Sequence, residues 1–199
     1  MKATAAVILK RIRVHGRGWV FTPRDFLDCG TRDAVRIVLW RLARDKTIRR
    51  LTHGVYNYPR VHKKLGILAP NPDEVAAVLA AKTGSRIQVS GARAANLLGL
   101  TDQVPAQLVY LTDGPARRVK IGAQTIQLKP ARPSRFPGAG TPAGLALQAI
   151  RAVGPNADKD KVVRQLSRAL RARDRAQLAK LIKHAPAWSH EIIRRLEGT

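Results

Sequence analysis

Residues 29–51, CGTRDAVRIVLWRLARDKTIRRL, combine a high density of arginine with the apolar spacing of an amphipathic helix. Six of these 23 residues are arginine. The apolar residues fall at positions i, i+3, i+4 and i+7, the spacing of one buried helix face, and they are Val35, Val38, Leu39 and Leu42. The segment therefore predicts a helix from about residue 32 to residue 45, with one face in a core and a basic face in solvent.

The residues before this helix predict two further helices and a short strand. Residues 3–14 carry apolar residues at helical spacing, and residues 19–21 have the pattern of a short extended segment. Thr22 is a favourable N-cap followed by a proline, so it predicts a short second helix, which Gly30 ends. Thr31 then caps the arginine-rich helix.

The residues after the helix predict a β-hairpin. Residues 48–51 and 55–58 alternate in polarity around a turn at residues 52–54, and Pro59 ends the second strand. The resulting order is helix, strand, helix, turn, helix, strand, wing and strand, which is typical of a winged helix-turn-helix domain over residues 1–60. In helix-turn-helix domains the helix after the turn lies in the major groove of DNA.

The arginine-rich helix is expected to contact base edges. Arg32 and Arg36 lie early on it, one turn apart, and arginine can donate two hydrogen bonds to guanine. The helix N-termini at Thr22 and Thr31 offer backbone N–H groups to phosphates. The alternative for the two arginines is an ordinary solvated helix face, which the surrounding element order disfavours.

The hairpin is expected to contact the DNA backbone or the minor groove through Arg49, Arg50 and His53. Trp40 is expected to pack at a domain edge rather than to contact DNA. The complete set of expected DNA contacts is Thr22, Arg24, Thr31, Arg32, Arg36, Arg41, Arg49, Arg50 and His53.

The whole chain is strongly basic, with 37 Lys and Arg against 13 Asp and Glu and a formal net charge of +24. Residues 1–60 carry 14 basic and 4 acidic side chains, residues 61–155 carry 12 and 4, and residues 156–199 carry 11 and 5. Such a charge attracts polyanions, so double-stranded DNA is the expected partner. A basic protein that binds DNA without sequence preference is an alternative. A GC-rich genome that favours arginine codons is another source of part of the charge.

A membrane partner is not expected. The longest apolar run, VAAVLAA, is too short to cross a bilayer. The first residues, MKATAAVILKRIRV, lack the small-residue cleavage site of a signal peptide. Cys29 is the only cysteine, so no intrachain disulfide can form, which agrees with a cytoplasmic location.

The rest of the chain predicts an α+β protein with three further parts. A proline-containing linker covers residues 61–72. A small α/β domain of alternating helices and strands covers residues 73–155, and its residues 130–143, rich in Pro, Gly and Arg, are expected to be a mobile connector. A basic helical extension covers residues 156–199.

No catalytic residue, metal site or cofactor is expected, and the chain is not expected to be an enzyme. The five histidines are scattered, and Cys29 has no base partner in the sequence. One alternative is a metal-dependent nucleic-acid-processing enzyme, in which Asp113 at the end of a strand would act with Gln127 and Lys129 on a later strand. Two-metal chemistry needs several carboxylates, and a glutamine replaces one of them here.

Two segments carry a family resemblance, GRGWVFTPRDFLDCGTRDAVRIVLWRLARDKTIRRLTHGVYNYP and SGARAANLLGLTDQVPAQLVYLTDGP. They resemble the antitoxin component (AbiEi-like) of type IV AbiE abortive-infection toxin–antitoxin systems, over roughly residues 4–130. The resemblance implies a transcriptional repressor that binds an inverted repeat in its own promoter and so autoregulates its operon. It also implies a second domain that counteracts a nucleotidyltransferase-type toxin without forming a stable complex with it. Residues 156–199 lie beyond the part that the resemblance covers.

Overall fold

The arginine-rich segment forms helix α2 (Arg32–Arg44), which confirms the helix that its apolar spacing predicts. The Thr31 hydroxyl accepts a hydrogen bond from the backbone N–H of Ala34 at 3.3 Å and so caps the helix. Val35 and Leu39 are fully buried, whereas the arginines of α2 are exposed. The apolar stripe therefore determines which side of α2 faces solvent.

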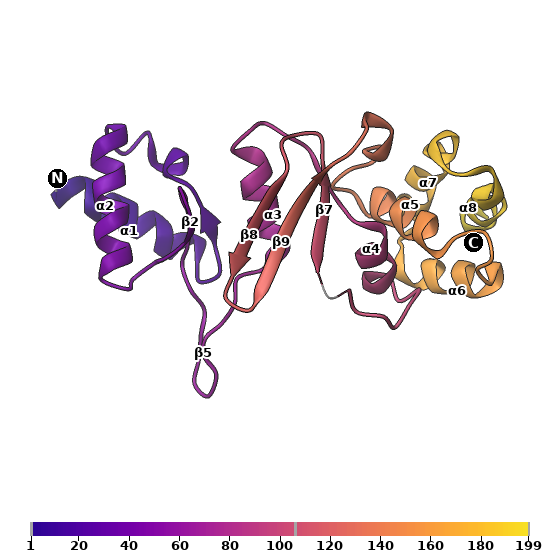
Figure 1. The fold of residues 1–199 in the computed structure, drawn as a ribbon, viewed down its shortest axis with the longest axis horizontal. Helices are drawn as coiled ribbons and strands as arrows, with labels where there is room; N and C mark the ends of the chain where they lie inside the picture. The colour runs from indigo at the N-terminus through magenta and orange to yellow at the C-terminus, as the bar shows by residue number, and fades with distance from the viewer. Residues whose placement is uncertain (1, 106, 199) are drawn as a thin grey trace. The chain divides into compact units, whose positions relative to one another are not determined.

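The computed structural model describes residues 2–105 and 107–198 and has an α+β fold (Figure 1). The chain divides into two compact units. The first unit consists of Met1–Thr83 and Val119–Ala123, and the second consists of Gly84–Arg118 and Gln124–Thr199. The elements up to residue 83 are α1 (Lys2–His15), β1 (Val20–Phe21), η1 (Pro23–Phe26), α2 (Arg32–Arg44), β2 (Arg49–Thr52), β3 (Val55–Asn57), β4 (Val61–His62), β5 (Gly66–Ile67) and α3 (Pro72–Ala81). The later elements are β6 (Ile87–Val89), α4 (Gly91–Leu97), β7 (Leu108–Thr112), β8 (Arg117–Ile121), β9 (Gln124–Pro130), η2 (Pro133–Arg135), α5 (Pro142–Val153), α6 (Lys159–Ala169), α7 (Ala172–Lys180), η3 (Ile182–His184), η4 (Ala187–Ser189) and α8 (His190–Glu197).

The first unit has the predicted element order of a winged helix-turn-helix. Strands β1, β3 and β2 form an antiparallel sheet in the order β1-β3-β2, and the β2–β3 hairpin is the wing. Gly54 at the hairpin turn has a φ of +64°, a conformation that glycine adopts without strain. The predicted second helix is a single 3₁₀ turn, η1, where Thr22 and Asp25 form a capping box. Helix α2 contacts both α1 and η1.

Aromatic rings fill the core of the first unit. The Phe21 and Phe26 rings meet edge to face with centroids 5.4 Å apart, and the Trp19 ring lies 4.6 Å from Phe21. Arg11 on α1 forms two hydrogen bonds to the Asp28 carboxylate, at 2.7 and 2.6 Å, and this pair lowers the pKa of Asp28 to about 2. These contacts attach α1 to the turn that precedes α2.

Two segments of the first unit differ from the prediction. Residues 61–72, expected to be a linker, contain a small antiparallel hairpin of β4 and β5 in which Val61 lies opposite Ile67. Helix α3, expected to open the second domain at residue 73, belongs to the first unit and contacts β1. Local sequence patterns do not show this contact, because it joins segments that are far apart in the chain.

The predicted strands after residue 83 form one sheet with the order β6-β7-β9-β8. Strand β6 is antiparallel to β7, and β7 is parallel to β9, with Leu108 opposite Ile126 and Thr112 opposite Pro130. The carboxyl ends of β7 and β9 therefore lie side by side.

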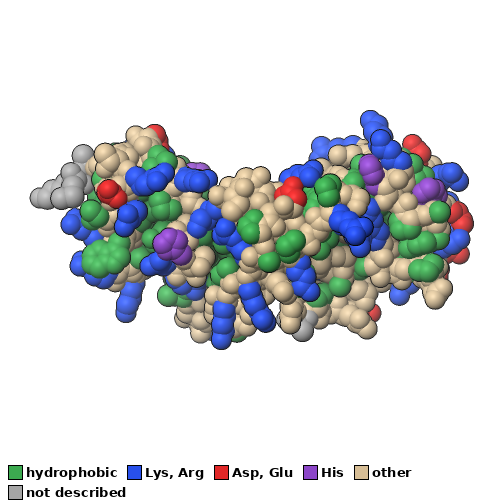
Figure 2. Space-filling model, turned by 45° about the horizontal axis from the view of Figure 1, so that its top comes forward, with side chains coloured by type: hydrophobic (Ala, Val, Ile, Leu, Met, Phe, Trp, Pro, Cys, Tyr) green, Lys and Arg blue, Asp and Glu red, His purple; other side chains and the backbone are tan. Residues whose placement is uncertain are grey.

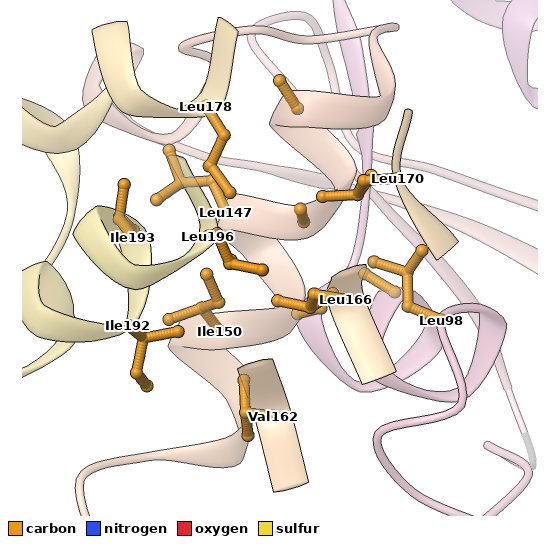
Figure 3. Packing of buried hydrophobic residues seen from close by; sticks show 14 of the residues in the cluster. Leu98, Leu147, Ile150, Val162, Leu166, Leu170, Leu178, Ile192, Ile193 and Leu196 are labelled. Carbon is orange, nitrogen blue, oxygen red and sulfur yellow. The ribbon is translucent and has the colours of Figure 1, made fainter. Parts of the chain in front are cut away.

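Helices α4 to α8 of the second unit enclose one apolar core (Figure 3). Ile150 of α5, Leu166 of α6, Leu178 of α7 and Leu196 of α8 are fully buried in it. Residues 156–199, expected to be a separate extension, thus share their core with helices of the predicted α/β domain. An apolar stripe predicts each helix, but it does not identify the helix against which that stripe packs.

Residues 130–143 are a packed part of the second unit, which corrects the expectation of a mobile connector. Phe136, directly after the 3₁₀ turn η2, is only 3% exposed. Gly138 and Gly144 are in direct contact, and a Cβ on either residue would meet the backbone of the other. The segment therefore holds its arginines at defined positions.

Replacing Leu196 by alanine is expected to lower the free energy of unfolding by about 2–5 kcal/mol, because it removes a fully buried side chain from the shared core. The control is Val104→Ala, because Val104 is 80% exposed and its truncation is expected to cost less than about 0.5 kcal/mol. Urea unfolding followed by circular dichroism measures both variants. Equal stability of the two variants would show that α8 is not part of the core.

Candidate nucleic-acid interface

A groove of about 440 Å³ lies between helix α2 and the wing of the first unit. Its lining residues are Pro23, Asp33, Arg36, Ile37, Trp40, Arg50, His53, Gly54 and Tyr56. Helix α2 contributes four of them, and the hairpin contributes another four. The structure therefore brings three of the expected DNA contacts together at one site: Arg36, Arg50 and His53.

Arg36 extends from the exposed side of α2 into the lining of this groove. Its side chain is 69% exposed, and its Nη1 donates to Asp33 Oδ1 at 3.2 Å. An ion pair as exposed as this contributes at most about 1 kcal/mol. Arg36 can therefore exchange the carboxylate for a base edge or a phosphate at little cost.

Arg49 and Arg50 are adjacent residues of β2 and therefore point to opposite faces of the sheet. Arg50 is exposed, and its Nη2 lies 3.2 Å from Nδ1 of His53. Arg49 is half-buried, and it donates from Nε to Asn57 Oδ1 at 3.2 Å and from Nη2 to the Leu68 carbonyl at 3.1 Å. Burial lowers the pKa of Arg49. The structure thus corrects the expectation for Arg49, which joins the hairpin to the residues after β5 and does not line the groove.

The two predicted N-caps differ in their exposure. Thr22 is only 8% exposed, and its backbone N–H and its hydroxyl both donate to the Asp25 carboxylate, at 2.6 and 3.0 Å. Its side chain is therefore used within the protein, which corrects its expected contact with DNA. Thr31 is exposed at the N-terminus of α2, where a phosphate can approach it.

Arg24, Arg32 and Arg41 are exposed, but they are not among the residues that line the groove. Arg32 lies one turn before Arg36 and extends the basic surface toward the N-terminus of α2. Arg41 lies about 140° around the helix axis from Arg36, at 3.6 residues per turn. Arg36 is thus the arginine of α2 that the fold directs into the groove.

Trp40 is exposed in the groove, which corrects its expected position at a domain edge. Its side chain is 57% exposed and that of Ile37 is 42% exposed, and the Arg44 guanidinium lies 5.2 Å from the Trp40 ring centroid. The sequence contains a signal for this surface, because Asp33, Ile37 and Trp40 recur at i, i+4 and i+7 on the side opposite the buried stripe.

Positive charge is abundant on the face of the molecule that Figure 2 draws. Figure 2 shows Lys and Arg side chains spread over the visible face, on which carboxylates are sparse. The groove itself combines the Arg36 and Arg50 guanidiniums with apolar surface from α2 and with one carboxylate, Asp33, among the described lining residues. Guanidiniums suit phosphates and guanine edges, and apolar groups suit thymine methyls.

The residues of the alternative nucleic-acid-processing site lie at different heights along β7 and β9, and the carboxylate of Asp113 is already bound. Asp113 accepts hydrogen bonds from the backbone N–H and from Nε of Arg86, both at 2.7 Å, and these bonds lower its pKa. The register of β9 on β7 places Gln127 four residues short of Asp113, a distance of about 13 Å along a strand. Lys129 lies two residues short of Asp113. Within residues 2–105 and 107–198, no group of three or more His, Cys, Asp or Glu is placed to hold a metal ion.

The fold and the groove define an α+β protein with an N-terminal winged helix-turn-helix unit. The chain belongs to the family described as "Family of unknown function (DUF6088)", whose model matches residues 7–178. No curated protein matches the sequence. The crystal structure of the RV2827C protein from Mycobacterium tuberculosis aligns with 98% of this chain and 82% of that chain, with 16% sequence identity and a TM-score of 0.43. That likeness is too weak to support an argument about function. Every helix in the described part of the chain is too short or too polar to cross a membrane.

Arg49→Ala is expected to lower the free energy of unfolding by about 1–3 kcal/mol, because it leaves the Asn57 and Leu68 acceptors without their donor. Arg50→Ala removes the same charge one residue away and is expected to cost less than about 0.5 kcal/mol, since Arg50 is exposed. Urea unfolding of both variants at one pH and salt concentration makes the comparison. Equal losses of unfolding free energy would contradict a structural role for Arg49 and an exposed, non-structural position for Arg50.

Proposed function

We propose that the chain is a cytoplasmic transcriptional repressor that binds double-stranded DNA sequence-specifically, at an inverted repeat in its own promoter. The observation that carries this proposal is the groove in which Arg36 of α2 faces the same space as Arg50 and His53 of the wing. A helix-turn-helix places its second helix in the major groove, and α2 occupies that position in the element order.

Recognition depends on α2 being presented in one orientation. Rotation of α2 about its axis would expose Val35 and Leu39, at a cost of about 1.5–3 kcal/mol for each side chain. Arg36 then donates to O6 and N7 of a guanine, and Ile37 and Trp40 offer apolar surface to a thymine methyl. These contacts distinguish base pairs.

The wing supplies contacts that do not depend on sequence. Arg50 and His53 are exposed beside the groove, and each can approach a phosphate of the backbone that borders the major groove. Lys82 Nζ donates to the His53 carbonyl at 2.7 Å and holds the turn of the wing. This part of the interface contributes affinity and its salt dependence.

The chemistry of the groove favours specific binding over the alternative of non-specific binding. A surface that binds only phosphates gains nothing from the exposed Ile37 and Trp40, and the carboxylate of Asp33 repels a phosphate. The same groups are useful against base edges, because a carboxylate accepts a hydrogen bond from cytosine N4 and apolar groups contact thymine.

The antitoxin role rests on the family resemblance of the segment that begins SGARAANLLGLT. We extend the proposal to that role: the part of the chain after the winged helix counteracts a nucleotidyltransferase-type toxin encoded beside it. The two proteins act without a stable complex, as the resemblance implies.

Arg36→Ala is expected to weaken binding to the promoter repeat by about 1–3 kcal/mol and binding to a scrambled duplex much less, because only the repeat offers the guanine. Arg36→Lys keeps the charge but loses the two-pronged geometry, so discrimination is expected to fall more than affinity. Arg41→Ala is the matched control, since it removes the same charge from the same helix in a different direction. Fluorescence anisotropy with the upstream repeat and a scrambled duplex measures all three variants.

If Arg36→Ala lost the same affinity for both duplexes, Arg36 would contact only phosphates. That result would overturn its role in sequence recognition. In the same titrations, Arg50→Ala is expected to weaken binding to both duplexes alike. It is also expected to lower the slope of log affinity against log salt concentration by about one unit. An unchanged slope would show that the wing does not contact the DNA backbone.

Co-expression tests the antitoxin role separately. In cells arrested by an adjacent nucleotidyltransferase gene, this chain is expected to restore growth, and affinity purification is expected to recover the two proteins apart. Arg36→Ala is expected to restore growth equally well, because its effect is confined to DNA binding. Growth arrest that persists with the chain present at high level would refute the antitoxin role and leave the DNA-binding proposal standing.

A further inference from the structure

A second hollow, of about 710 Å³, lies in the second unit and collects three arginine residues, Arg132, Arg135 and Arg151. We call it the arginine pocket. Its remaining lining includes Ser134, Gln148 and apolar side chains, and no Asp or Glu lines it among the described residues. Three cations without a carboxylate between them form a site of strongly positive potential.

The position of the arginine pocket follows from the sheet. Leu111 near the end of β7 and Pro130 at the end of β9 both line it, and these two strands are parallel. Crevices outside the carboxyl ends of parallel strands are common ligand sites, because the loops there diverge and leave a concavity. The segment after β9 crosses this end of the sheet and carries Arg132 and Arg135, while Arg151 comes from α5.

The Gln148 side chain helps to fix one of these loops. It is only 1% exposed, and its Nε2 donates to the backbone carbonyl of Arg135 at 2.8 Å. Phe136, the next residue, is buried at 3% exposure. The backbone that carries Arg135 is therefore anchored on both sides, and the exposed guanidinium can turn toward the pocket.

Arg151 occupies a position that is unfavourable for a cation. Its Nη2 donates to the carbonyls of Ser134 and His184, at 3.3 and 2.5 Å, whereas its Nη1 is buried and has no partner among the described residues. Burial and, second, the positive charge of Arg135 lower the pKa of Arg151. A further hollow, of about 440 Å³, shares Arg135 and Arg151 with the arginine pocket and adds Lys183 to the positive groups. An anion between the guanidiniums would offset both the burial and the repulsion.

We propose that the arginine pocket binds the phosphate group of a nucleotide-sized ligand. A phosphate carries up to two negative charges and several strong acceptor oxygens, which match several guanidiniums better than a single carboxylate does. The volume lies in the range of pockets that hold one small organic ligand, and the apolar lining suits the less polar part of such a ligand. This site goes beyond the proposed function, since no residue of the groove in the first unit takes part in it.

Calorimetric titration of the full chain in about 0.15 M salt tests the proposal with defined probes. The probes are nucleoside 5′-monophosphates, the same nucleosides without phosphate, inorganic phosphate, and a short 5′-phosphorylated single-stranded oligonucleotide. The monophosphates are expected to bind and the nucleosides are not. The oligonucleotide shows whether the phosphate comes from a free molecule or from a nucleic-acid strand.

Arg135→Ala is the diagnostic variant, because Arg135 is exposed and its truncation is expected to leave the fold intact. It is expected to lower the affinity for the phosphate-bearing probe by at least about tenfold. Arg168→Ala on α6 removes the same charge from an exposed position outside the pocket lining and is expected to change the affinity less than about twofold. Arg151→Lys keeps the charge of the buried group but removes its fork, and it is expected to weaken binding while thermal unfolding shows a folded protein.

Two outcomes would overturn the proposal. If the monophosphates and the oligonucleotide bind no better than the nucleosides, no phosphate site exists. If Arg135→Ala and Arg168→Ala lost the same affinity for the phosphate-bearing probe, its binding would be a general attraction of an anion to a basic protein. Binding that depends on Arg135 and is unchanged by Arg168→Ala supports the site, whichever of the two phosphate sources is preferred.

Discussion

The burial of one side of α2 is the contact on which the candidate interface depends. Val35 and Leu39 are fully buried in a core that also contains Phe21 and Phe26. Because the apolar stripe covers only one side of the helix, its burial leaves the opposite arc in solvent. The β1-β3-β2 sheet then holds the wing beside that arc, and the groove forms between them. A hydrophobic contact inside the core thus determines which arginine side chain of α2 lines the groove.

Positive charge is the second constraint on the molecule. Several of the few carboxylates lie in ion pairs with arginine or lysine, among them Asp28, Asp113, Asp160 and Glu191. These pairs join segments within each unit, but they leave a formal net charge of +24 on the chain. Mutual repulsion of so many cations opposes the compact state, and a bound polyanion relieves it. Stability and the proposed binding of anions are therefore linked by the same electrostatics.

The groove and the arginine pocket present cations in different ways. In the groove, Arg36 and Arg50 are exposed on a helix and a hairpin, where an extended duplex can reach both. In the arginine pocket, three arginines line one concavity of about 710 Å³, and Arg151 is half-buried there, so the site that we propose takes a single phosphate group. The different shapes explain why we assign the two sites to different ligands.

The sequence by itself determined several elements of the first unit: the spacing of Val35 and Leu39 predicts α2, Thr31 predicts its start, and alternation predicts the wing. It also predicted that Arg36 is exposed, because burial of one helix side settles the direction of the other. Only the tertiary structure separated Arg49 from Arg50, since one hydrogen bond of Arg49 goes to Leu68, beyond the β4–β5 hairpin. It also placed α8 in the core of the second unit and formed the arginine pocket from α4, α5, the ends of β7 and β9, and the segment after β9. The physical reason is range: propensity, capping and periodicity act within one element, whereas burial and shared contacts depend on which distant segments pack together.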